Sequence, residues 1–268
     1  TGNATVADAA GVTTAATGAI SLTAVTGITG DGVVTTGNAT VDATTADAVD
    51  TATSGTITLN VTGAGDVGLS GTNALTIGTA TVTNNTTNDT ATTGNIVVTS
   101  ADRVNNGTTP GDLDVSFGTA SGGQTNTAGT LTVTTDGGAA AAGEIQITSG
   151  EALTVGVLTT AAGAQNIDIA TTGNANLTWS GASTLDTDVV TLGGGATGVL
   201  TISAAQTVGS LTGTGNSVAV SADVTTSNST TTAVPSGGIT LTADTTTIVL
   251  SAGAGNLTTG TAAVADTA

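Results

Sequence analysis

The chain has 268 residues and a formal net charge of −18, with Arg103 as its only basic residue and with no His, Cys, Met or Tyr. Most enzyme mechanisms use a general acid or base, a thiol or a cationic group, and this composition supplies almost none of them. An acidic surface without Lys repels nucleic acids and anionic membranes, and no run of about 18 apolar residues could form a membrane-spanning helix.

The composition favours β-structure over helix or disorder. Thr, Gly, Val, Asn and Asp are among the poorer helix formers. Only 7% of the residues are charged, which does not fit the usual composition of disordered chains. Aromatic residues are limited to Phe117 and Trp179, so a thick globular core is excluded. A thin core of Val, Ile, Leu and Ala suits a stacked solenoid, in which each coil buries few side chains against its neighbours.

Short segments with alternating apolar residues recur along the chain, and most begin just after Gly or Asn. In chain order, strands are predicted at 19–24, 56–61, 74–79, 95–100, 112–117, 130–135, 144–149, 166–171, 199–204, 217–222 and 238–243. The alternation, as at Ile57, Leu59 and Val61, places one face in a core and turns the other, mostly Thr, to solvent. From Gly55 to Gln165 the residues that open these segments lie 14 to 22 positions apart, which indicates a repeat.

This repeat predicts an all-β fold, a parallel β-helix or β-solenoid with coils of about 20 residues. About 13 such coils, each rising about 4.8 Å, would form a rod of about 60 Å. No Pro-rich or charged linker divides the chain, so residues 1–268 are predicted to form a single elongated domain. The alternative is a set of β-sandwich modules, as in filament subunits, which would contain antiparallel hairpins.

Two pairs of carboxylates are candidate metal ligands. Asp112 and Asp114, and likewise Asp186 and Asp188, occupy alternate positions and are expected on one face of an extended segment. Hard oxygen ligands suit Ca²⁺, and an acidic chain with almost no counter-charge would gain from cation binding. We therefore predict these four residues as Ca²⁺ ligands, with solvated turn carboxylates as the alternative. No catalytic residue and no organic cofactor is predicted.

Other motifs have simpler structural explanations. Gly63 to Gly68 formally matches the dinucleotide-binding pattern GxGxxG, but a predicted strand follows it where that motif requires a helix. Thr-x-Thr pairs such as Thr56/Thr58 and Thr130/Thr132 invite an ice-binding interpretation. Such a face needs Thr at matching positions of successive coils, and these pairs are expected to skip coils. The β-propensity of Thr explains them.

The segment from 143 to 182, GEIQITSGEALTVGVLTTAAGAQNIDIATTGNANLTWSGA, resembles filamentous-haemagglutinin-like adhesins in its cadence. The Thr-, Ala-, Gly- and Val-rich character of the whole chain resembles repetitive regions of bacterial S-layer proteins of the type-I-secreted kind. The Gly/Asp nonapeptide of the repeats-in-toxin family is absent apart from an imperfect fragment at 63–66, so the Ca²⁺ ladder of that family does not carry over. The resemblance implies an extracellular or cell-surface location and a structural or adhesive role.

Together these features predict a non-catalytic building block of an extracellular surface layer, filament or adhesin stalk. The alternatives are a carbohydrate- or host-binding adhesin module, a polysaccharide-active enzyme or an ice-binding protein. An enzyme would have to rely on Arg103 and Trp179, which lie 76 positions apart. The expected partners are other copies of the chain and surface glycans. The ends, 1–16 and 260–268, lack residues that block strand addition, and association is expected to strengthen with salt or Ca²⁺.

Overall fold

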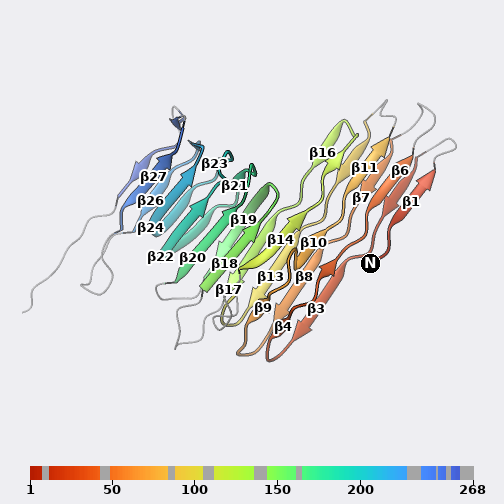
Figure 1. Ribbon diagram of the computed structural model, residues 1–268, viewed down its shortest axis with the longest axis horizontal. Coiled ribbons are helices and arrows are strands. Elements are labelled where there is room, and N and C mark those ends of the chain that lie inside the picture. The colour runs from red at the N-terminus through yellow and green to blue at the C-terminus, as the bar shows by residue number, and fades with distance from the viewer. Residues whose placement is uncertain are drawn as a thin grey trace, which may run out of the picture.

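The computed structural model describes residues 1–7, 12–42, 49–83, 88–104, 112–135, 144–160, 165–227, 237–245, 247–251 and 255–259. Within these ranges the chain forms 29 strands and no helix, and the strands stack side by side along the molecule (Figure 1). Every strand pairing is parallel and joins segments distant in sequence. The predicted all-β parallel solenoid is confirmed. The antiparallel hairpins of the β-sandwich alternative do not occur in the described part of the chain.

Two long parallel sheets run through the molecule. The nine-stranded sheet contains, in spatial order, β28 (Ile248–Leu250), β25 (Ser217–Val220), β23 (Val199–Ile202), β21 (Leu177–Trp179), β19 (Leu153–Thr159), β17 (Leu131–Thr135), β13 (Ile96–Ser100), β8 (Ile57–Val61) and β3 (Ile20–Ala24). The ten-stranded sheet contains β29 (Leu257–Thr258), β26 (Val224–Thr226), β24 (Gln206–Gly215), β22 (Ser183–Gly193), β20 (Asn166–Thr171), β18 (Glu144–Ser149), β14 (Leu113–Phe117), β10 (Leu75–Ile77) and β5 (Val34–Thr35), with β27 (Ile239–Ala243) also paired to β24. A separate pair, β4 (Ile28–Gly30) and β9 (Val67–Leu69), accompanies the N-terminal coils.

Two four-stranded sheets form an extension that we call the arm. Its outgoing sheet contains β1 (Ala4–Ala7), β6 (Ala39–Asp42), β11 (Ala80–Thr83) and β15 (Ala120–Ser121), and its returning sheet contains β2 (Thr14–Ala16), β7 (Thr51–Thr53), β12 (Thr90–Thr92) and β16 (Thr125–Thr127). In Figure 1 the arm strands lie at the upper right, beyond the N-terminal coils of the two long sheets. Between the two arm sheets lies a small second core of Ala15, Ala39, Val41, Ala52, Ala80, Val82 and Ala91.

Coil length changes along the solenoid. In the N-terminal half, equivalent residues of successive coils, such as Ala4, Ala39, Ala80 and Ala120, are 35 to 41 positions apart. From β17 to β25 the spacing falls to between 18 and 25, and from β25 to β28 it rises again to 30. The predicted coil of about 20 residues therefore holds approximately between β17 and β25 and is wrong for the N-terminal half. There each coil also passes through the arm and contains two of the predicted periods.

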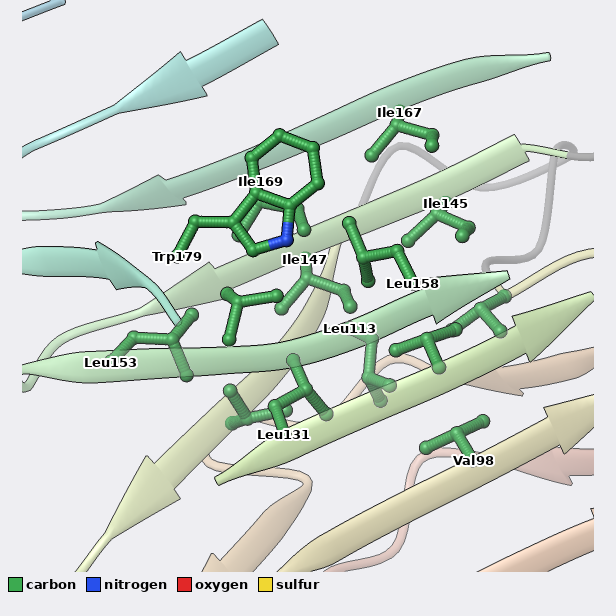
Figure 2. Close-up of a cluster of buried hydrophobic side chains, with 14 of the residues drawn as sticks. Val98, Leu113, Leu131, Ile145, Ile147, Leu153, Leu158, Ile167, Ile169 and Trp179 are labelled. Atoms are coloured by element: carbon green, nitrogen blue, oxygen red, sulfur yellow. The ribbon is translucent and has the colours of Figure 1, made fainter. Parts of the chain in front are cut away.

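The longer coils also correct the predicted length of the rod. Each coil contributes one strand to the nine-stranded sheet, so the solenoid has nine coils where about 13 were expected. Eight spacings of about 4.8 Å between these strands give a rod length of about 40 Å instead of about 60 Å. The main core lies between the nine-stranded and ten-stranded sheets and contains almost all of the large apolar side chains that are buried among the described residues. Figure 2 shows Trp179 and Leu153 of the nine-stranded sheet facing Ile147 and Ile169 of the ten-stranded sheet. One Trp per molecule suffices because each coil adds only a thin layer to this core.

Glycine lines the neck between the main core and the arm. A Cβ on Gly94 would lie 2.1 Å from the carbonyl oxygen of Gly55, and one on Gly129 would lie 1.8 Å from that of Gly94. Successive coils therefore approach too closely here for any side chain. Buried hydroxyl groups complete the neck: the Gly94 N–H donates to Ser54 Oγ (3.1 Å) and the Gly129 N–H to Thr93 Oγ1 (2.8 Å). This geometry explains why several predicted strands open immediately after Gly.

Candidate functional site

The first predicted metal pair lies at the start of β14. Asp112 is exposed and directly precedes the strand, whereas Asp114 lies half-buried on it. Oδ2 of Asp114 accepts a hydrogen bond from the backbone N–H of Asn73 in the preceding coil (2.8 Å). One oxygen of this carboxylate therefore already joins two coils. Ca²⁺ binding at this pair stays a prediction.

The second pair, on β22, does not share one face. A bulge between Leu185 and Val189 interrupts the alternation of the strand, so Asp186 is exposed while Asp188 is 1% exposed. The expectation of a common face was wrong because it assumed an unbroken period of two. Ca²⁺ binding by these residues stays a prediction, and the described residues contain no group of three or more Asp or Glu positioned to hold a metal ion.

Asp188 instead fastens a corner of the coil. Its Oδ1 accepts the backbone N–H of Gln165 (2.9 Å) and its Oδ2 accepts the hydroxyl of Thr160 (2.5 Å). Burial raises the pKa of Asp188, and the nearby Asp186 carboxylate adds to the rise, while the two hydrogen bonds oppose it. The ionised form is thus retained at a cost in stability near neutral pH.

We expect Asp188→Asn to raise the free energy of unfolding at pH 7, because the amide carries no charge for burial to destabilise. The pKa of Asp188 is higher in the folded state than in the unfolded state, so stability rises as pH falls through the folded-state pKa. The difference in the free energy of unfolding between the variant and the parent should therefore decrease toward pH 4. Urea unfolding across this range measures the difference. Asp186→Asn removes the neighbouring charge but keeps the buried carboxylate, so it should give a smaller gain of the same sign. A variant less stable than the parent at pH 7 would show that the charged hydrogen bonds outweigh burial.

Two further buried carboxylates lie at a corner of the arm. Asp50 and Asp89 are each 2% exposed and lie on adjacent coils, directly before β7 and β12. Asp89 Oδ1 accepts the backbone N–H of Asp50 (2.9 Å), and Asp50 Oδ1 accepts that of Thr13 (3.0 Å). They repeat, in the arm, the coil-to-coil contact that Asp188 makes in the main body. The repeated sequence DTAT at 50–53 and 89–92 was the available signal.

The arm ends in a polar cap where the coils shorten. Asn126 occupies the position that Ala91 fills in the coil before it, and its side chain accepts the N–H of Gly123 (3.0 Å) and donates to the carbonyl of Gly123 (2.8 Å). A hollow of about 280 Å³ beside it is lined partly by Phe117 and Glu151. The other polar side chains that line it are the hydroxyl groups of Thr119 and Thr154 and the amide of Asn126.

The first and last coils, by contrast, expose side chains of the type that the other coils bury. Leu22 on β3 and Val25 just after it are 38% and 66% exposed, and at the opposite end Ile248 and Leu250 on β28 are 45% and 50% exposed. Within the described residues β3 pairs only with β8, and β28 only with β25. Each end therefore presents an open strand edge beside apolar surface. These end coils are the candidate site for assembly.

Comparison with known proteins gives no relative. No family model, no curated protein and no solved structure matches this chain. None of the described segments forms a helix long and apolar enough to cross a membrane.

Proposed function

We propose that the chain is a non-catalytic structural building block of an extracellular layer, filament or adhesin stalk, and that its end coils pair with other copies. The observation that carries this proposal is the exposure of core-type side chains on the open edges of β3 and β28. Each such edge has backbone N–H and C=O groups that another strand can satisfy. The resemblance to surface-layer proteins and adhesins supports the same role. Surface glycans remain proposed secondary partners.

Thr23→Pro should abolish end-to-end association without breaking an internal ladder bond. The N–H of Ile20 donates to Thr56 (2.8 Å) and the C=O of Ala24 accepts from Thr62 (2.9 Å), so both point toward β8. Alternate residues of a strand turn these groups to opposite sides, so the N–H of Thr23 points to the open edge. Sedimentation velocity should find larger species for the parent chain than for this variant.

The control is Thr23→Ala, which keeps the N–H and should associate like the parent. The net charge of −18 opposes association at low ionic strength, so the larger species should increase with salt or with Ca²⁺ and decrease with a chelator. A parent chain that is monomeric at high concentration under all these conditions would contradict the proposal. Turnover of a polysaccharide, abolished by replacing Arg103 or an Asp pair, would contradict its non-catalytic part.

A further inference from the structure

Two neighbouring sheets of this acidic chain carry no charged residue on their outward surface. We use the term neutral face for the outward side chains of the returning arm sheet and of the nine-stranded sheet, which follow one another along the chain. In the first four coils its outward positions are Thr14, Ala16, Ala19, Ser21, Thr23, Thr51, Thr53, Thr56, Thr58, Asn60, Thr90, Thr92, Asn95, Val97, Thr99, Thr125, Thr127, Thr130, Thr132 and Thr134. Fourteen of these twenty positions are Thr and none is charged.

The C-terminal coils continue this pattern. Their outward residues on the nine-stranded sheet are Thr154, Val157, Thr159, Thr178, Val199, Thr201, Ser217, Ala219 and Val249. The described carboxylates lie in turns, at buried corners, on the ten-stranded sheet and on the outgoing arm sheet, as Asp168 on β20 and Asp42 on β6 illustrate. The neutral face is therefore a continuous surface without charge on a chain of net charge −18.

The size of the neutral face fits a protein partner. Nine strands about 4.8 Å apart and about five residues long cover about 700 Å², and the four strands of the returning arm sheet, each of three residues, add about 200 Å². A stable interface of standard size buries about 800 Å² on each partner. The area of the neutral face thus reaches what a dimer needs.

Charge points to a second copy of the chain as that partner. Two copies repel each other over any surface that carries carboxylates, and this repulsion is smallest when neutral faces meet, because the charged sides then point away. A surface that pairs with itself gives an isologous contact with two-fold symmetry, the commonest form of homo-oligomer. Flat rows of Thr at the strand spacing can interdigitate between two sheets.

One residue is placed to act at the centre of such a contact. Val157 lies on β19, the fifth of the nine strands in spatial order. An irregular register between Leu131 and Val133 of β17 and their partners on β19 turns Val157 outward, where it is 44% exposed. An exposed apolar residue in the middle of an uncharged surface is well placed to be buried by a partner.

We propose that the neutral face packs against the neutral face of a second copy around a two-fold axis, giving a lateral contact distinct from the end coils. This inference extends the proposed structural function by naming the surface through which neighbouring rods join side by side. The interface lacks aromatic and Arg anchors, so we expect weak pairing that becomes cooperative in a lattice.

The test compares Val157→Asp with Val189→Asp, each made in a Leu250→Pro background. The N–H of Ser251 donates to Val220 (3.0 Å), so that of Leu250 points to the open edge of β28, and its loss removes end-to-end contacts without changing the neutral face. Val189 is a matched control because it is also an exposed Val (45%) but lies on β22 of the ten-stranded sheet. Sedimentation equilibrium in 0.15 M salt should find a dimer for the background and for Val189→Asp. Val157→Asp should weaken the dimer at least about a hundredfold, because it would bury an unpaired carboxylate. Circular dichroism checks that both variants fold.

Cross-linking is a second measurement, which does not require the affinity of the dimer to be known. The chain contains no Cys, so single Val157→Cys and Val189→Cys variants report position unambiguously. A bis-maleimide cross-linker should join Val157→Cys chains into dimers and leave Val189→Cys chains single, because residues on the outer sides of the dimer are separated by both solenoids.

The outcomes separate this inference from the proposed function. A parent that assembles, with a Leu250→Pro variant that is monomeric, would overturn the lateral contact and leave end-to-end assembly standing. If Val157→Asp and Val189→Asp weakened the dimer equally, the lateral contact would also be overturned, because general charge repulsion would then explain the effect. A monomeric Leu250→Pro variant that slows ice recrystallisation would identify ice as the occupant of the neutral face. A parent that is monomeric throughout would overturn both proposals.

Discussion

Gly94→Ala should unfold the N-terminal coils and leave the C-terminal coils folded. The added Cβ would meet three backbone atoms of the preceding coil: the oxygen of Gly55 at 2.1 Å, its carbonyl carbon at 2.4 Å and the nitrogen of Thr56 at 2.8 Å. Backbone cannot rotate away as a flexible side chain can, so the coils would have to separate at the neck. We expect a loss of at least about 3 kcal/mol in the stability of the N-terminal coils.

Local unfolding is expected because each coil contacts only its neighbours, which makes the stability of a solenoid approximately a sum of coil and interface contributions. Trp179, the only Trp, lies in the C-terminal half and reports on that half alone. In the Gly94→Ala variant, urea unfolding followed by circular dichroism should show an additional transition at low urea concentration. The urea midpoint followed by Trp179 fluorescence should not change. Gly150→Ala is the control, because no atom lies within 4 Å of its added Cβ. Equal shifts in both signals would show that the solenoid unfolds as one unit.

The sequence was sufficient to predict the fold class but not the length of each coil. Strand alternation at Ile57, Leu59 and Val61 is the same whether a coil turns back after one strand or continues into an arm. The distance between Gly55 and Gly94 gives the coil length correctly, because these residues contact one another at the neck. Two repeats carried the same information: GNATV at 2–6 and 37–41, and DTAT at 50–53 and 89–92. They are 35 and 39 positions apart and match the observed coils.

Features that depend on the order of strands in space could not be predicted. The expectation that Thr-x-Thr pairs skip coils is wrong for the arm, where Thr51/Thr53 and Thr90/Thr92 lie in register and the hydroxyl of Thr90 donates to that of Thr51 (3.3 Å). The separation of charged and neutral faces likewise becomes visible only when each strand is assigned to a sheet. The burial of Asp188 beside the exposed Asp186 depends on a bulge that no residue pattern announced.

Trp179→Ala should cause the second large loss of stability, and it should affect the C-terminal coils. Trp179 is 0% exposed and lies in register between Val155 of β19 and Ile202 of β23. Figure 2 places its ring against Ile169 and Ile147 of the facing sheet. Removing a fully buried aromatic side chain leaves a cavity in a core only one layer thick on each side, so we expect a loss of about 3–5 kcal/mol.

Trp179→Phe is the matched variant and should cost much less. The indole Nε1 is buried without a hydrogen-bond partner among the described residues, so replacing indole with phenyl removes an unsatisfied donor while keeping most of the apolar volume. Urea unfolding by circular dichroism should place the Phe variant near the parent and the Ala variant far below it. If Trp179→Phe lowered the free energy of unfolding as much as Trp179→Ala, the indole would have to be held by a polar contact rather than by packing. Because coils interact only with neighbours, Trp179→Ala should leave the arm and its neck intact, reversing the pattern expected for Gly94→Ala.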